Sequence, residues 1–231
     1  MSGEEPALRP ALRTPRSAAI AGIVFSLLLG FALVLVRLSV PPDLAQSGGW
    51  VTDPAKRGWV GLGVNLVPFA GIAFLWFIGV IRDQIGRHED RFFATVLLGS
   101  GLLFVAMLFV SAAVVGGMMQ EVSSRGATLS GSDAWAIDAR ITRLLLSIYA
   151  MRMAGVFMIA VSTIALRTQV MPRWIAFSGY ACAVVLLVSV GLTPWVQLLF
   201  PLWVLVLSVE ILRRSWTSTP SAGAGPPDAE R

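Results

Sequence analysis

The sequence predicts an all-α integral membrane protein, a helix bundle with six transmembrane helices. Two facts of composition indicate this class: 56% of the 231 residues are hydrophobic and only 13% are charged. A soluble domain carries about 25% charged residues, so this chain has too little polar surface for a soluble monomer. The third observation is that the charges lie between long uncharged blocks, which predicts that lipid surrounds the bundle.

The chain begins with a polar, arginine-containing arm. Residues 1–17 contain closely spaced prolines, which oppose a helix, so we expect a disordered cytoplasmic segment. The uncharged run that follows, 18–36, has 19 residues and is longer than the apolar part of a signal peptide, about 7–15 residues. We therefore interpret it as a retained first span.

The remaining spans follow from the length of each uncharged run, since about 20 apolar residues cross the hydrocarbon of a bilayer. The expected spans are residues 18–36, 59–81, 92–117, 144–166, 174–191 and 194–212. Together they form one membrane domain, 18–214, with long outer loops at about 38–57 and 118–143. The tail 215–231 is rich in Ser, Gly, Ala and Pro and is expected to be disordered in the cytoplasm.

The last apolar stretch, 174–209, has two alternative interpretations. Its 36 residues would form a helix of about 54 Å, too long for one span. Within it, Thr193 can cap a helix that starts at Pro194, directly after Gly191. We expect two short spans joined by a tight turn, and a single long span is the alternative.

The distribution of basic residues supports six spans with both chain ends inside. With that topology, ten basic residues lie on the cytoplasmic side and six outside, whereas a single last span would give eight on each side. Arg37 and Arg143 oppose the rule, because both lie beside the membrane on the outer side. Arginine dominates, with Lys56 the only lysine, as in GC-rich bacterial genomes, so we expect a bacterial cell membrane protein.

Composition also excludes several kinds of chemistry. A single cysteine, Cys182, and a single histidine, His88, allow no disulfide, no dithiol redox pair, and no zinc or haem site built from several such ligands. No cofactor is expected. The net charge of +5 is not gathered on one face with aromatic residues, so nucleic acid is not an expected partner.

One charge, Arg152, lies deep in a predicted span and is the main candidate for function. It lies nine residues after Arg143, about 13 Å along a helix, so its side chain can also reach lipid phosphate or water by snorkelling. Polar groups expected at similar depth suggest an outer-leaflet cluster. The candidate cluster consists of Arg152, Asn65, Gln197, Tyr149 and Glu121.

The first predicted span carries a stripe of small residues, Ala18, Gly22, Ser26 and Gly30. This spacing allows close approach of another helix. The stripe does not tell whether that helix belongs to the same chain, to a second copy or to a membrane partner.

The motifs of membrane enzymes are missing from the sequence. There is no H-E-x-x-H metalloprotease motif, and no predicted span carries paired carboxylates for acid–base chemistry. The small-residue stripe and the long outer loops favour a non-enzymatic scaffold or modulator of a membrane complex. The alternative is a transporter or channel subunit for an anion or small solute, with an outward-facing site around Arg152.

Two segments resemble multi-pass membrane proteins of GC-rich bacteria that have no assigned activity. They are EDRFFATVLLGSGLLFVAMLF, Glu89 to Phe109, and the Met171-Pro172-Arg173-Trp174 entry to the fifth span. The likeness extends from about Trp59 to Arg214. It implies a membrane bundle and transfers no catalytic residue.

Overall fold

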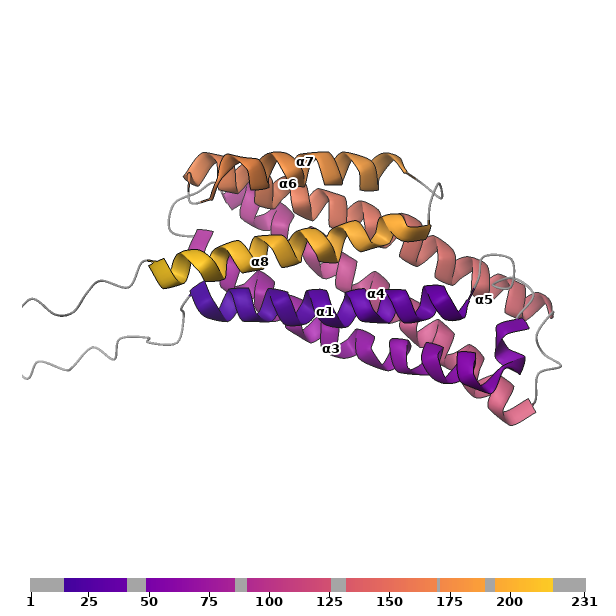
Figure 1. Ribbon diagram of the computed structural model, residues 1–231. Coiled ribbons are helices and arrows are strands. Elements are labelled where there is room, and N and C mark those ends of the chain that lie inside the picture. The colour runs from indigo at the N-terminus through magenta and orange to yellow at the C-terminus, as the bar shows by residue number, and fades with distance from the viewer. Residues whose placement is uncertain are drawn as a thin grey trace, which may run out of the picture.

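The computed structural model describes residues 15–40, 49–85, 91–125, 132–169, 171–189 and 194–217. All its elements in these ranges are helical, and the long helices run roughly parallel to one another (Figure 1). They are α1 (Pro15–Ser39), η1 (Gly49–Thr52), α3 (Pro54–Ile85), α4 (Arg91–Arg125), α5 (Asp133–Leu144), η3 (Leu145–Ala150), α6 (Met151–Thr168), α7 (Arg173–Val188), η4 (Pro194–Leu198) and α8 (Leu199–Thr217). The all-α prediction is confirmed. Most of the predicted arm and tail, and the turn at 190–193, lie outside the described residues.

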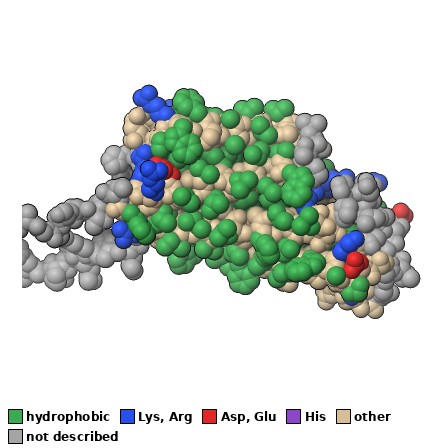
Figure 2. Space-filling view, viewed as in Figure 1, with side chains coloured by type: hydrophobic (Ala, Val, Ile, Leu, Met, Phe, Trp, Pro, Cys, Tyr) green, Lys and Arg blue, Asp and Glu red, His purple; other side chains and the backbone are tan. Residues whose placement is uncertain are grey.

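The surface of the bundle has the pattern of a membrane protein. Among the described residues, five helices are long and apolar enough to cross a membrane, and α7, with 16 residues, is shorter, about 24 Å. Figure 2 shows a broad hydrophobic band between two ends that carry the arginines and acidic side chains. The start of α1 and the end of α8 lie together at one end, where Arg16 Nη2 donates to the carbonyl oxygen of Ser215 at 3.3 Å.

The predicted break in the last apolar stretch is present. Helix α7 ends at Val188, η4 begins at Pro194, and α8 runs back alongside α7 (Figure 1). Trp203 in α8 donates its indole N–H to the carbonyl oxygen of Ile175, near the start of α7, at 3.4 Å. The stretch therefore forms two antiparallel helices and not one continuous helix.

Helices α3, α4 and α5 extend further than the uncharged runs indicated. The segment 118–143, expected as a loop, is helical up to Arg125 and again from Asp133, where the Ser132 hydroxyl accepts the N–H of Trp135 at 3.3 Å. From Asp133 the helix continues to Thr168, 36 residues or about 54 Å. The physical reason is that charged residues end a hydrocarbon span without ending a helix.

A small apolar cluster holds these extensions together. It consists of Trp50, Val51, Val60, Met118, Val122 and Trp135, all buried. The rings of Trp50 and Trp135 lie 6.0 Å apart. This cluster lies at the end of the bundle opposite the start of α1 and the end of α8 (Figure 1). We call this end the pocket end, after the pocket that lies there.

The centre of the bundle is filled by phenylalanines, one or more from each of the five long helices. Phe74 of α3 has its ring 4.4 Å from Phe25, 5.4 Å from Phe104, 5.1 Å from Phe157 and 5.6 Å from Phe200. All five side chains are fully buried. This Phe74 cluster ties α1, α3, α4, α6 and α8 to one another.

The small-residue stripe is used inside the chain. Ala18, Gly22 and Ser26 are buried where α1 packs against α3 and α8. A Cβ added at Gly22 would meet the Ser208 hydroxyl and the Phe77 ring, whereas one added at Gly30 would meet nothing within 4 Å. The close helix approach that the stripe predicts is therefore made by the chain's own helices.

This difference within one stripe gives a stability prediction. Gly22→Ala forces the methyl group into α8 and α3 and is expected to cost about 1–3 kcal/mol, the usual range for overpacking. Gly30→Ala is the matched control on the same helix and is expected to leave stability unchanged or slightly raised. Thermal unfolding in neutral detergent measures both, and equal losses for the two variants would contradict this account of the stripe.

Candidate functional site

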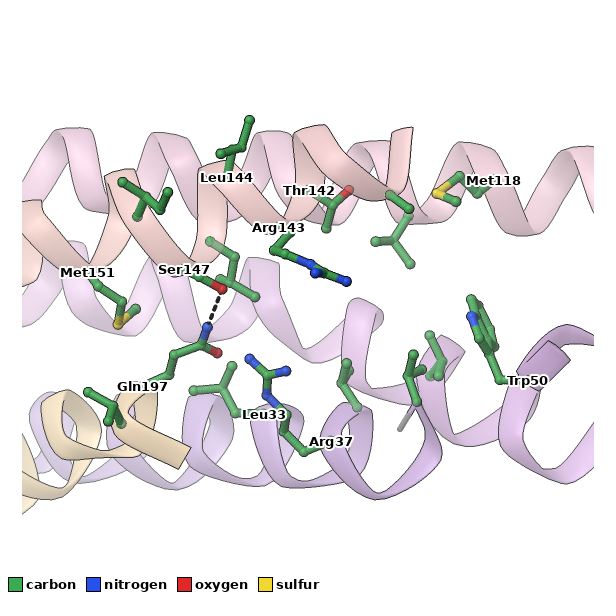
Figure 3. A pocket seen from close by; sticks show the side chains of 18 of the residues that line it. Leu33, Arg37, Trp50, Met118, Thr142, Arg143, Leu144, Ser147, Met151 and Gln197 are labelled. Atoms are coloured by element: carbon green, nitrogen blue, oxygen red, sulfur yellow. Dashed lines mark hydrogen bonds between the residues drawn. The ribbon is translucent and has the colours of Figure 1, made fainter. Parts of the chain in front are cut away.

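A pocket of about 380 Å³ lies at the pocket end of the bundle. This volume is within the range of small-molecule sites, about 300–1,000 Å³. The pocket is lined mainly by residues of α1, the α5–η3–α6 helix and η4, close to the end of α1 at Ser39 and the end of α7 at Val188. Figure 3 shows Arg37, Arg143, Ser147 and Gln197 around it. The pocket therefore lies at the boundary between the membrane band and the helical extensions.

Two arginines from different helices share this pocket. Arg37, in the last turn of α1, and Arg143, at the end of α5, both place their guanidinium groups in the space between the two helices (Figure 3). Arg37 is partly buried, and Arg143 is exposed on the open side. No carboxylate of the described residues forms an ion pair with either one or lines the pocket. The pocket therefore concentrates positive charge.

Several buried polar atoms in the pocket lack a hydrogen-bond partner. In the described part of the chain five buried side-chain atoms have none, and three of them belong to pocket residues: Trp135 Nε1, Thr142 Oγ1 and Gln197 Oε1. Leaving such a group unpaired costs about 1–3 kcal/mol. Buried polar groups are normally satisfied, so these three atoms mark polar groups of the pocket wall that this structure leaves unpaired.

The two sides of the pocket are joined by one hydrogen bond. The Nε2 amide of Gln197, in η4, donates to Ser147 Oγ at 2.8 Å, and the Gln197 side chain is 5% exposed. Other serines in the membrane helices, such as Ser100 and Ser111, donate to the carbonyl four residues earlier in their own helix. Ser147 therefore serves as a contact between helices.

Ser147 also lies in the middle of an irregular turn. Residues Leu145–Ala150 form a π-helical segment between α5 and α6. Such wider turns occur often at functional sites. Because Leu146, Ser147 and Ile148 of this segment all line the pocket, the irregular turn belongs to the pocket wall.

This arrangement is suited to binding an anion. Guanidinium groups bind carboxylate and phosphate through paired N–H donors. Among the described residues that line the pocket there is no Asp, Glu, His or Cys, so this set supplies charge and donors without a carboxylate or imidazole base.

Of the predicted cluster, only Gln197 lines this pocket. Arg152 is exposed on α6, and Tyr149 is 52% exposed. Asn65 is exposed on α3 and donates to the carbonyl of Gly61 in its own helix at 2.9 Å. Glu121 is exposed near the end of α4.

Sequence reasoning missed the two pocket arginines, although it held a signal for them. Arg37 and Arg143 were noted because they oppose the positive-inside rule. That expected position was the signal, and the structure places both side chains in one pocket. A search for paired arginines that oppose the predicted topology would have found them.

No family model, no curated protein and no solved structure matches the chain. Fold and pocket define its class from its own residues: an all-α membrane protein with a positively charged pocket at one end of the bundle.

Proposed function

We propose that the chain is a six-span protein of the bacterial cell membrane, with both ends in the cytoplasm, that binds an anionic ligand in its outward-facing pocket. The observation that carries this proposal is the pairing of Arg37 with Arg143 beside unpartnered buried polar atoms. The excess of arginine near the chain ends supports the orientation, because basic residues favour the cytoplasmic side.

The scaffold hypothesis depended on two features that the fold now accounts for differently. The small-residue stripe packs against the chain's own α3 and α8, and much of the expected outer loop 118–143 is helical. The alternative of an anion-binding protein gains support. The proposed binding site, however, lies around Arg37 and Arg143 and not around Arg152.

The pocket is closed toward the middle of the bundle. The fully buried Phe74 cluster fills the centre between the five long helices. This supports a binding component open to one side rather than a continuous channel.

The proposal is tested by thermal unfolding of the full chain in neutral detergent, with inorganic phosphate against chloride at equal ionic strength. A ligand that binds only the folded state stabilises it by about 2.7 kcal/mol at a concentration one hundred times its Kd. We expect phosphate to raise the unfolding temperature of wild type and of Arg152→Gln, since Arg152 lies outside the pocket. An equal rise for Arg37→Gln and wild type, or no rise at all, would refute an anion site here.

A further inference from the structure

The depth of Arg37 in the membrane is the first clue to the ligand. Arg16 and Arg37 lie at opposite ends of α1, 21 residues or about 32 Å apart along the helix, which matches a hydrocarbon thickness of about 30 Å. Arg16 is at the end where the chain begins and Arg37 is at the pocket end. Arg37 therefore lies at the level of lipid headgroups, where phosphate is abundant.

The charge of the pocket is the second clue. Two guanidinium groups match a phosphomonoester, whose charge is about −1.5 to −2 at pH 7. A phosphodiester or a carboxylate carries one negative charge and would leave one arginine uncompensated.

The apolar part of the pocket is the third clue. From the arginines it extends toward the bundle centre along Leu33, Leu146, Met151, Leu186 and Val196. Met151 lies eight residues after Arg143, about 12 Å deeper along its helix, and beyond Ser147 in the view of Figure 3. We call these five residues the deep arm.

Gln197 lies between the charged part and the deep arm. Its unpartnered Oε1 accepts hydrogen bonds and so suits a hydroxyl group, not a phosphate oxygen. A glycerol hydroxyl placed between a phosphate and an acyl chain has the required order of groups.

Resting on the proposed function, we infer that the ligand is a lipid phosphomonoester. Its phosphate lies between Arg37 and Arg143, its glycerol hydroxyl donates to Gln197, and its alkyl chain lies in the deep arm. Lysophosphatidic acid is the simplest molecule with these three parts.

The test compares lipids that differ in one part at a time, by native mass spectrometry of the full chain released from neutral detergent. The probes are lysophosphatidic acid, lysophosphatidylglycerol and lysophosphatidylcholine with the same chain, and glycerol 3-phosphate without a chain. We expect lysophosphatidic acid to bind about tenfold or more tighter than each of the others, a difference of about 1.4 kcal/mol. Arg37→Gln with Arg143→Gln should remove this preference, and Arg152→Gln should retain it.

A variant in the deep arm tests the contribution of the ligand's alkyl chain separately from that of its phosphate. Val196→Trp fills the arm and is expected to remove the advantage of lysophosphatidic acid while glycerol 3-phosphate still binds. Val206→Trp, 42% exposed on α8, is the matched control. If Val196→Trp does not fold, ethyl, butyl and octyl phosphate are compared on wild type, where each methylene buried in the arm raises affinity up to about fourfold.

The outcomes separate this inference from the proposed function. Equal binding of lysophosphatidic acid and lysophosphatidylglycerol would contradict the preference for a phosphomonoester. Equal binding of lysophosphatidic acid and glycerol 3-phosphate would contradict an alkyl-chain site in the deep arm. Neither result would contradict the proposed anion-binding pocket. If no anion binds in a manner that depends on Arg37 and Arg143, the proposed function fails as well.

Discussion

Replacing Arg37 and Arg143 together by glutamine is expected to abolish phosphate binding. Each guanidinium forms charge-assisted hydrogen bonds worth about 1.5–3 kcal/mol, so each single variant should lose about 10- to 100-fold in affinity. The double variant should lose more affinity than either single variant, although not the simple product of the two factors, because both arginines contact the same phosphate. Binding isotherms for phosphate on wild type, both single variants and the double variant measure this.

Although these substitutions should weaken phosphate binding, we expect them to raise the stability of the ligand-free protein. Without a ligand, two positive charges share one pocket, and no carboxylate of the described residues lies there to compensate them. Arg143→Gln removes this repulsion and is expected to raise the stability of the empty protein slightly, by at most about 1 kcal/mol for so exposed a group. A variant that loses both binding and stability would instead point to a structural role for Arg143.

Phe74→Ala is expected to produce the largest loss of stability. It removes a ring that touches phenylalanines of α1, α4, α6 and α8 and leaves a cavity in their midst. Phe→Ala costs about 3–5 kcal/mol in soluble cores. We expect a loss of about 3 kcal/mol here, at the low end of this range. Inside a membrane the van der Waals packing of the ring still stabilises the bundle, but no hydrophobic force drives the helices together.

Phe69 provides the matched control on the same helix. Its side chain is 63% exposed on α3, on the surface of the hydrophobic band. Phe69→Ala should change stability by less than about 0.5 kcal/mol. Reversible unfolding in detergent compares both variants, and a loss at Phe69 as large as at Phe74 would contradict the central role of the Phe74 cluster.

The helices were predictable because their signals are local. The uncharged run after Arg16 and the stop before Pro194 each depend on a few neighbouring residues, and the structure has a helix starting at Pro15 and a helical segment starting at Pro194. The extensions were not predictable from the same signal. Trp135 and Val122 keep their helices together outside the uncharged runs through contacts between distant segments.

The site was less predictable than the fold for a related reason. Gln197 was found because depth in the membrane can be counted along one helix. Arg37 and Arg143 are 106 positions apart in sequence, so only the folded bundle, in which α1 and α5 both border the pocket, reveals that they share it. Arg152 drew attention by its depth, yet the direction in which it points depends on the π-helical segment before it, which the sequence does not signal.

The charge of the pocket is measured most directly by chemical modification inside it. In a Cys182→Ala background, Ala139→Cys places a single thiol in the pocket, one turn before Arg143, and Ser124→Cys places one on the exposed end of α4 as a control. We expect an anionic methanethiosulfonate to modify the Ala139→Cys thiol about tenfold faster, relative to a cationic one, than it modifies the control. This preference should fall when Arg37 and Arg143 are replaced by glutamine and when phosphate is added. If the cationic reagent reacts equally fast or faster at Ala139→Cys, the pocket does not attract anions and its central role is contradicted.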